Sequence, residues 1–435
     1  MKAKNLWWSA VAIGATAVVG AAATLGVSVH NEYKDLHHPS AYEAAEPETL
    51  LKPVDTDAAG AARPDTAAIK AGLDDAYSSH ADALGTFGAA VINTASGELV
   101  WEKDAARPLT PASSTKVLTV AAATWQLPTD KRITTEVVRG AHPGNVVIKA
   151  AGDVWMTSQQ LDELAAQIKE LGEDVGGVYV DTRGWPGEAI APGADPANVD
   201  EGFVAPMEPA MLYGGRIGAE GGDVPRSHTP AKDVARALAD RLGAPIADYG
   251  VAPADAEVLA TTQSAPLSER AEKMMKHSDN VMAEAIAREM VSARGAEASF
   301  AGAAAATLDV LTEHGINSEG VQINDNSGLS EDNRIPAGVL ANVVAQAAKD
   351  PALSPLLGYL PVAGGDGTLD DRYDGLSGRG FVRAKTGTLT GISALAGFVP
   401  GQSGTQYAFA FLVNNGDLLA ARQAQDELAS VLRQY

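Results

Sequence analysis

The C-terminal third of the chain contains three strand-like runs in close succession, and they constrain the fold more than any other feature. VRAKTGTL (382–389), SALAGFVP (393–400) and TQYAFAFLVNN (405–415) are largely apolar and rich in residues that favour β-structure. The turns between the runs are short and contain glycine, so neighbouring runs are expected to pair as antiparallel strands. A helical run, 417–435, follows the last strand.

Earlier segments supply the rest of this sheet and its helices. GAAVINTASGELVWEKD (88–104) predicts a hairpin that turns at Ser96-Gly97 and can join the same sheet. SSTKVLTVAAATWQL (113–127) is helical up to Pro128, and helices return in 267–291 and 299–315. The predicted class is therefore α/β (α+β), with an antiparallel sheet flanked by helices.

The pattern of predicted strands, turns and helices in the region 129–260 differs from that of the segments on either side. Short strand-like runs alternate with glycine and proline turns, and two helical runs, 158–172 and 231–243, lie among them. We interpret it as an inserted, mainly β module. The main domain then consists of 67–128 and 261–435.

The N-terminus predicts export. Lys2 and Lys4 precede an uncharged run over 6–29, which is typical of a signal peptide or a membrane anchor, here 1–30. Residues 31–66 are polar and without a clear period, as in a linker. We expect an extracytoplasmic protein, secreted or anchored at the outer face of the plasma membrane, with no other membrane contact.

Composition excludes several classes of function. The 435-residue chain has no cysteine, so disulfides, thiolate metal sites and cysteine catalysis are absent. Its formal net charge of −22 makes nucleic acid a poor partner, because an acidic surface repels phosphates. His37 and His38 lack further ligands at suitable spacing. These two histidines therefore do not predict a metal site.

Three short motifs stand in a fixed order along the chain. Ser113-Ser114-Thr115-Lys116 begins a predicted helix, Ser278-Asp279-Asn280 lies at a break between helical runs, and Lys385-Thr386-Gly387 lies on a predicted strand. A serine hydroxyl needs a base within hydrogen-bond reach, and positions i and i+3 share a helix face. Ser113 is thus the candidate nucleophile, with Lys116 as its base.

The remaining motif residues fit the other needs of acyl transfer. Burial and a second cation, Lys385, would lower the pKa of Lys116. The Ser278 hydroxyl can bridge the two lysines and pass a proton to a leaving amine. The Asn280 amide can hold a substrate amide, while backbone N–H groups of Ser113 and Thr388 can form an oxyanion hole. The candidate substrate-binding residues are Asn280, Lys385, Thr386, Gly387 and Thr388, of which Lys385 and the two threonines suit a terminal carboxylate.

Each motif residue also has an ordinary structural interpretation. Ser113 can cap a helix, Lys116 can be a solvated first-turn side chain, and Lys385 can be a charge on an edge strand. Taken singly, these interpretations are stronger than catalysis. The ordered set of three motifs, each on a suitable element, favours the catalytic one.

At this point the chain resembles the class C low-molecular-mass penicillin-binding proteins, the D-alanyl-D-alanine carboxypeptidase/endopeptidase family. The resemblance covers about residue 85 to the C-terminus. It rests on PASSTKVLT (111–119), HSDNVMAEAIA (277–287), FVAPMEPAMLYGGRI (203–217), DNSGLSEDN (325–333), LPVAGGDGTLDDR (360–372) and VRAKTGTLTGISALAG (382–397).

The resemblance implies a penicillin-binding-protein/β-lactamase-like transpeptidase domain split by an inserted module. It implies a serine D-Ala-D-Ala carboxypeptidase that acts on peptidoglycan peptides through an acyl-serine and is covalently inhibited by β-lactams. It implies no metal and no organic cofactor. Endopeptidase action on cross-links stays open. Glu331, where the family usually has arginine, and a short gap between Ser113 and Ser278 put the substrate-peptide preference in doubt.

Three alternatives remain at this stage. A class A-like β-lactamase would use a glutamate after the second motif, and EHGIN (313–317) has a similar pattern. However, Glu313 ends a predicted helix, with Gly315 as its C-cap. A non-catalytic wall-binding protein on the same fold has no chemical reason to keep all three motifs. A histidine-based hydrolase is disfavoured because His277 and Ser278 are helix neighbours that do not face each other.

Overall fold

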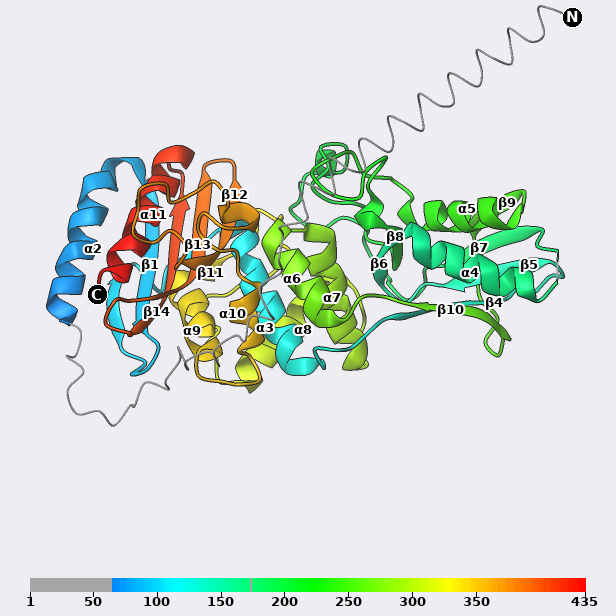
Figure 1. Ribbon diagram of the computed structural model, residues 1–435, viewed down its shortest axis with the longest axis horizontal. Helices are drawn as coiled ribbons and strands as arrows, with labels where there is room; N and C mark the ends of the chain where they lie inside the picture. The colour runs from blue at the N-terminus through cyan, green and yellow to red at the C-terminus, as the bar shows by residue number, and fades with distance from the viewer. Residues whose placement is uncertain (1–64, 173) are drawn as a thin grey trace, which may run out of the picture. The chain divides into compact units, whose positions relative to one another are not determined.

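The computed structural model describes residues 65–435, except residue 173 (Figure 1). The expected signal peptide or anchor lies outside the described residues, as does the expected linker up to residue 64. Within the described part, no helix is long and apolar enough to cross a membrane. The first described helix, α2 (Thr66–His80), is capped by Asp65, whose carboxylate accepts from two backbone N–H groups of the first turn.

The expected antiparallel sheet is present in five strands. Its order is β12-β13-β14-β1-β2, and every neighbouring pair is antiparallel. The strands are β1 (Thr86–Asn93), β2 (Leu99–Lys103), β12 (Arg383–Leu389), β13 (Ile392–Pro400) and β14 (Gln406–Asn414). The predicted N-terminal hairpin thus joins the three C-terminal strands, and β12 forms one edge.

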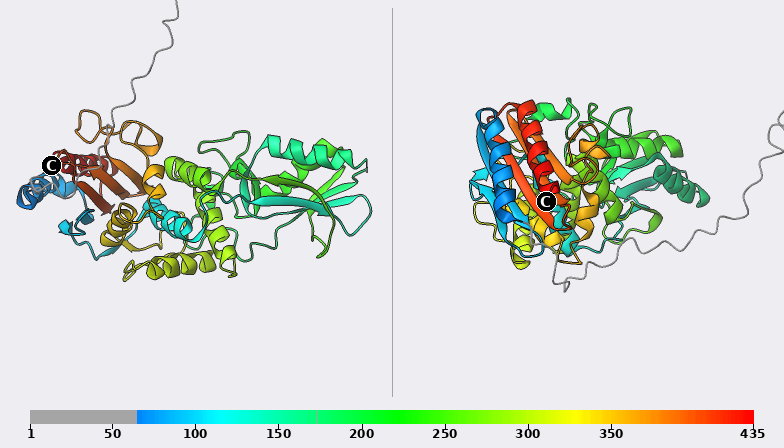
Figure 2. Two further views of the ribbon diagram at one scale, coloured as in Figure 1. Left: turned by 60° about the horizontal axis from the view of Figure 1, so that its bottom comes forward. Right: turned by 60° about the vertical axis from the view of Figure 1, so that its left-hand side comes forward.

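The two faces of this sheet differ in side-chain size. In β14, Phe409, Phe411 and Val413 pack on one side, whereas Ala408 and Ala410 lie on the other. The bulky face is covered by α2 and α11 (Leu418–Arg433), which lie side by side in Figures 1 and 2. The small residues of the opposite face allow helices to approach the sheet closely.

That opposite face carries the helices that build the site. The 3₁₀ turn Ala112–Thr115 packs against β12 and β13, and α9 (Ala337–Ala347) covers β14 and β1. Behind them lies a group of helices that pack together through largely apolar buried faces. They are α3 (Lys116–Gln126), α6 (Leu267–His277), α7 (Asn280–Ala293), α8 (Phe300–Glu313) and α10 (Pro355–Tyr359).

The inserted region has its own five-stranded sheet, ordered β10-β4-β5-β7-β9. The β10-β4 and β4-β5 pairs are antiparallel, whereas β5-β7 and β7-β9 are parallel because helices connect them. The elements are β4 (Thr134–Arg139), β5 (Asn145–Lys149), α4 (Ser158–Glu170), β7 (Gly177–Asp181), α5 (Pro230–Leu242), β9 (Ile246–Tyr249) and β10 (Val258–Gln263). Both expected helices form, and they bury one face of the sheet.

Two pairs of short strands complete the fold, one in the insert and one in the main domain. β6 (Asp153–Met156) pairs with β8 (Ala210–Leu212), and β3 (Pro108–Leu109) pairs with β11 (Ile335–Pro336). The expected boundary at 260 falls inside β10, which continues the insert's sheet to Gln263. We therefore propose that the insert ends after Gln263 and that the main domain resumes at α6.

Candidate active site

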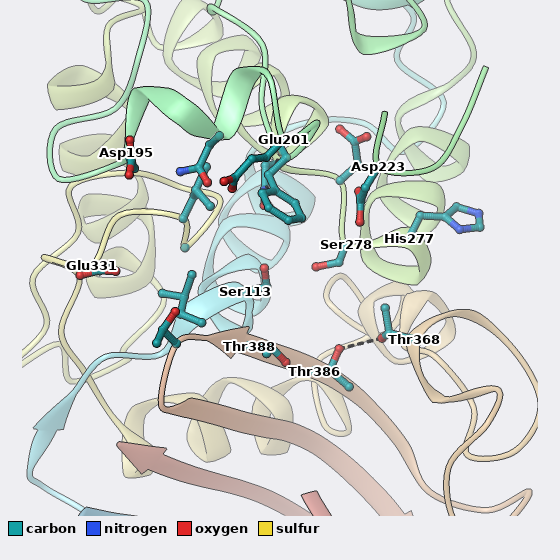
Figure 3. Close-up of a pocket in the computed structure, with 18 of the residues that line it drawn as sticks. Ser113, Asp195, Glu201, Asp223, His277, Ser278, Glu331, Thr368, Thr386 and Thr388 are labelled. Carbon is teal, nitrogen blue, oxygen red and sulfur yellow. Dashed lines mark hydrogen bonds between the residues drawn. The ribbon is translucent and has the colours of Figure 1, made fainter. Parts of the chain in front are cut away.

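A pocket of about 710 Å³ opens where the 3₁₀ turn, the α6–α7 junction and the edge strand β12 meet (Figure 3). The insert supplies part of its wall through residues between 195 and 226. The lining includes Ser113, Ser278, Asn280, Thr386 and Thr388 from the three motifs. Figure 3 shows Ser113, Ser278, Thr386 and Thr388 around the same space.

Ser113 lies in a tight and partly strained turn. The hydroxyl of Ser114 donates to Pro111 O, and the hydroxyl of Thr115 donates to Ala112 O, so both neighbours stabilise the turn. Ala112 has φ +46°, which is unfavourable for a residue with a side chain. A Cβ on Gly328 would lie 1.9 Å from Ala112 O, so only glycine allows that approach. Strain held by close packing is typical of functional sites.

Lys116, the first residue of α3, is fully buried and has three hydrogen-bond partners. Its Nζ lies 2.9 Å from Ser113 Oγ, 2.6 Å from Asn280 Oδ1 and 2.6 Å from Ser327 O. Burial lowers the pKa of Lys116 to about 8, although the carboxylates of Asp325, Asp279 and Glu284 raise it in part. A lysine with such a pKa can act as a base near neutral pH.

The second motif lies at the junction between two helices. Ser278 ends α6 with φ +57°, a left-handed conformation that turns the chain sharply. Asp279 then caps α7, because its Oδ1 accepts from the N–H of Met282 at 2.7 Å. This arrangement places Asn280 at the start of α7, facing Lys116.

The insert holds this junction through a buried ion pair. Arg216 donates to Asp279 Oδ2 at 2.9 Å, and both side chains are about 5% exposed or less. Burial alone would raise the pKa of Asp279, but the nearby cations Arg216 and Arg226 keep it below its usual value. The Asn280 Nδ2 also donates to Phe203 O at 2.9 Å.

Lys385, on β12, is the second buried lysine. Its Nζ donates to Ser278 Oγ at 2.9 Å and to Thr386 O at 2.8 Å. Burial, followed by the positive charge of Lys116, lowers the pKa of Lys385 well below its usual value. The Thr386 hydroxyl donates to the hydroxyl of Thr368 at 2.8 Å, as Figure 3 shows.

The backbone of β12 passes directly beside the nucleophile. A Cβ on Gly387 would lie 2.7 Å from Pro111 O and 3.1 Å from the backbone nitrogen of Ser113. Ala384 N–H points to the outer edge of the strand, where it donates to Pro361 O. Since strand N–H groups alternate in direction, the Thr388 N–H points to the same outer edge, into the pocket.

Two contacts were not anticipated from the sequence. Arg422, on α11, donates to Thr388 Oγ1 at 3.1 Å and lines the pocket, and no acidic side chain of the described residues lies within ion-pair distance of it. Ser327, in the turn after α8, contributes the backbone oxygen that Lys116 contacts. A backbone oxygen and a side chain from distant parts of the sequence form no sequence motif, so neither contact could be identified from the sequence.

The residues that the alternative functions would use lie outside the pocket or point away from Ser113. Glu313 is at the end of α8, where Arg294 donates to it at 2.6 Å, and it does not line the pocket. The His277 ring is exposed and points away from Ser113 in Figure 3.

Glu331, the residue that stands where the family usually has arginine, lines the pocket. Among the described residues, no group of three or more histidine and acidic side chains could hold a metal ion.

Comparisons with known proteins agree on one family. The model of the "D-Ala-D-Ala carboxypeptidase 3 (S13) family" matches residues 70–225 and 222–435. The carboxypeptidase DacB of Mycolicibacterium smegmatis is 42% identical over 372 residues, which are 80% of this chain and 81% of that protein. The D-alanyl-D-alanine carboxypeptidase of Actinomadura sp. strain R39 is 31% identical, with 80% and 81% covered.

Solved structures share the fold. Penicillin-binding protein 4 (dacB) of Haemophilus influenzae superposes with a TM-score of 0.72 at 23% identity, covering 83% of this chain and 99% of that one. A predatory peptidoglycan endopeptidase of Bdellovibrio bacteriovorus superposes with a TM-score of 0.53 at 16% identity, covering 80% and 92%. The predicted α+β transpeptidase-like fold is therefore confirmed.

Proposed function

This chain belongs to the D-Ala-D-Ala carboxypeptidase 3 (S13) family and is a serine-type D-Ala-D-Ala carboxypeptidase, and we propose that Ser113 is its nucleophile and Lys116 its base. The observation that carries the assignment is the contact between Ser113 Oγ and the Nζ of a buried lysine. The other two partners of that nitrogen, Asn280 Oδ1 and Ser327 O, can only accept hydrogen bonds. A neutral amine therefore has both N–H bonds occupied and its lone pair free for the Ser113 hydroxyl.

Acylation follows from this arrangement. Lys116 takes the hydroxyl proton while Ser113 Oγ bonds to the carbonyl carbon of the penultimate D-Ala. The carbonyl oxygen becomes negative between the N–H groups of Ser113 and Thr388. The C–N bond then breaks, and the Ser278 hydroxyl gives its proton to the leaving amine while it receives one from Lys385, which contacts it at 2.9 Å. The proton that Lys116 took from Ser113 then restores Lys385. Water later cleaves the acyl-serine and releases the shortened peptide.

Recognition of the terminal carboxylate is assigned to the β12 side of the pocket. Thr386 and Thr388 offer hydroxyls, while Lys385 and Arg422 offer positive charge. Such a site requires a free C-terminal carboxylate, which a carboxypeptidase substrate has. We therefore assign carboxypeptidase action to this side of the pocket, and a cross-linked peptide dimer is the substrate that tests endopeptidase action.

The substrate and location that fit this chemistry are the stem peptides of peptidoglycan outside the plasma membrane. The D-Ala-D-Ala end is the group that such peptides present, and the lysines near the N-terminus followed by the uncharged run over 6–29 suit export. The mass of the mature protein would show whether the N-terminal segment is cleaved or retained.

β-Lactams are proposed as covalent inhibitors that acylate the same serine. Glu313, the glutamate that a class A-like β-lactamase would use, ends α8 and pairs with Arg294 outside the pocket, so it cannot activate a deacylating water at Ser113. This favours a slow peptidase-like deacylation over a β-lactamase. The test is intact-protein mass after timed incubation with benzylpenicillin, beside Ser113→Ala. A long-lived adduct on the native protein alone supports the proposal, whereas no adduct on folded native protein contradicts it.

A further inference from the structure

One face of α7 carries two side chains that lead to Lys116. Asn280 and Glu284 are four residues apart and therefore lie on the same face of the helix. Asn280 accepts a hydrogen bond from Lys116 directly, whereas Glu284 reaches it through the backbone of the 325–330 turn. The proposed mechanism gives Glu284 no role.

Glu284 holds the residue whose carbonyl oxygen contacts the base. Its Oε1 accepts from Asn326 N–H at 2.6 Å and from Ser327 N–H at 2.7 Å, and the residue is 1% exposed. The carbonyl of Ser327 then accepts from Lys116 Nζ at 2.6 Å. A single residue, Ser327, therefore connects the Glu284 carboxylate to Lys116, because its N–H contacts the carboxylate and its carbonyl contacts the lysine.

The other contacts of this turn lie within it or join it to α3 and α8, where Thr119 donates to Asn326 O at 2.6 Å and Thr307 donates to Asn326 Oδ1 at 2.7 Å. Asp325 accepts from the N–H groups of Gly328, Leu329 and Ser330, all within the turn itself. Glu284 is the side chain of α7 that ties the turn to the helix carrying Asn280. Loss of that tie would free the Ser327 carbonyl to move away from Lys116.

The position of this carbonyl decides where the lone pair of Lys116 points. A neutral amine has two N–H bonds, and Asn280 Oδ1 and Ser327 O accept both of them. If Ser327 O moved away, an N–H would turn toward Ser113 Oγ, and the lone pair would no longer face the hydroxyl. Proton transfer depends strongly on such geometry, and a misplacement of about 1 Å can cost about 100-fold in rate.

We propose that Glu284 is a positioning residue for the acylation base, holding the Ser327 carbonyl on Lys116 so that the lysine accepts the Ser113 proton. This inference rests on the proposed function of Ser113 and Lys116. Glu284 acts through the turn and does not touch the substrate.

The charges around Glu284 show which substitution preserves its contacts. The charged groups that bear on it and on Lys116 are Asp325 in the turn, Arg288 on α7, Asp279 and Lys385 on β12. Burial, followed by the charge of Asp325, raises the pKa of Glu284 to about 8, while Arg288 lowers it in part. The ionised carboxylate of Glu284 in turn raises the pKa of Lys116. Within the described chain, Glu284 Oε2 has no hydrogen-bond partner, so glutamine can keep the Oε1 contacts.

The experiment compares Glu284→Ala and Glu284→Gln by the rate of acylation with a fluorescent penicillin across pH, per penicillin-titratable site. For Glu284→Ala we expect a loss of about 10- to 100-fold, because the turn loses its anchor. For Glu284→Gln we expect a near-native rate and a near-native acid limb, because the amide oxygen keeps both backbone contacts and the raised pKa leaves Glu284 mostly uncharged below about pH 8.

Glu289→Ala is the matched control. Glu289 is a second buried glutamate of α7, but it pairs with Arg270 at 2.7 Å and does not contact the 325–330 turn. We expect this variant to lose stability and to keep the native acylation rate and pH profile. A purely structural role for Glu284 would make its variants behave in the same way.

The outcomes separate this inference from the function on which it rests. A native rate and unchanged profile in Glu284→Ala would overturn the positioning role. If that variant fails to fold, a loss of about 10-fold or more in the acylation rate of folded Glu284→Gln overturns it instead, because glutamine can keep both Oε1 contacts. Failure of the native protein itself to form an adduct would contradict the assignment of Ser113, whatever the Glu284 variants do.

Discussion

Two buried lysines within one small site set the chemistry at the residue scale. Burial makes the charged form of each costly, and the positive charge of Lys116 adds to the effect on Lys385. The hydrogen bonds differ as well, because Lys116 contacts two pure acceptors and Ser113, whereas Lys385 contacts Ser278 and Thr386 O. Lys116 therefore suits the role of base, whereas Lys385 suits the roles of proton relay and partner of the substrate carboxylate.

The first prediction concerns pH. The base form of Lys116 has lost a proton, so acylation by penicillin should rise with pH and level off above about 8, the pKa to which burial lowers this lysine. Lys116→Arg should slow acylation by about 100- to 10,000-fold, because arginine does not lose its proton in this range. Stopped-flow acylation rates across pH provide the measurement. A flat profile with the native lysine would exclude it as the base.

The second prediction concerns Arg422. Arg422→Ala should lower kcat/KM for a peptide ending in a free D-Ala carboxylate by about 10- to 100-fold, because a charge-assisted hydrogen bond is lost. The same peptide with a C-terminal amide should be cleaved equally slowly by both proteins. Arg433→Ala is the control, since Arg433 lies on the same helix but stacks on Phe381. An equal loss for acid and amide would point to folding or to Thr388 rather than to charge.

At the element scale, the insert takes part in building the site. Arg216, just before a loop of the insert, pairs with Asp279 at the start of α7, and Phe203 O contacts Asn280. The guanidinium of Arg216 also stacks on Trp155 of β6, 4.8 Å from the ring centre. These contacts link the insert to the second motif, so its fold affects where Ser278 and Asn280 lie.

The third prediction tests this link. Arg216→Met leaves Asp279 as a buried, unpaired carboxylate, which should cost about 3–5 kcal/mol of unfolding free energy. Adding Asp279→Asn removes the orphan charge and should recover much of that loss, because the asparagine can still cap α7. Denaturant unfolding of the two single variants and the double variant measures the coupling. Additive losses would show that the pair does not act as a unit.

The fourth prediction concerns the approach of β12 to the 3₁₀ turn. In Gly387→Ala the new Cβ would meet Pro111 O at 2.7 Å, so the strand must move away from Ser113. We expect acylation to fall about 100-fold with the fold retained. Gly358→Ala in α10 is the control, because no atom lies within 4 Å of its added Cβ. Native acylation in Gly387→Ala would show that the strand tolerates the displacement.

The sequence predicted the elements better than the contacts between them. The short glycine turns within 382–415 predict the antiparallel pairing of β12, β13 and β14, whereas the pairing of β1 with β14 joins segments that are distant in the sequence. The parallel pairing of β5, β7 and β9 was not predicted, since it depends on how two helices cross the sheet. The structure brings Ser113, Lys116, Ser278, Asn280 and Lys385 together, and their roles remain predictions. Ser327 O and Arg422 were missed because tertiary packing alone places them.

At the scale of the whole molecule, every residue assigned to catalysis or substrate binding lies within 65–435. The main domain surrounds the insert in sequence, yet both supply the pocket wall. Helix α2 completes the bulky face of the sheet, where Ile69 and Leu73 are 1% and 0% exposed. The α2 segment therefore belongs to the folded enzyme, although it lies at the start of the described chain.

The fifth prediction follows from where the folded part begins. A chain starting at residue 62 keeps Asp65, the cap of α2, and should be acylated by penicillin at the rate of the full-length protein. A chain starting at residue 84 lacks α2 and exposes the apolar surface that Ile69 and Leu73 covered. Since each buried aliphatic side chain contributes about 1.5–3 kcal/mol, that chain should lose at least about 3 kcal/mol of stability. Acylation rates and thermal midpoints of the three proteins test both parts. A slower rate in the chain from residue 62 would mean that residues 1–61 contribute to catalysis, whereas equal midpoints for all three would mean that α2 does not support the sheet.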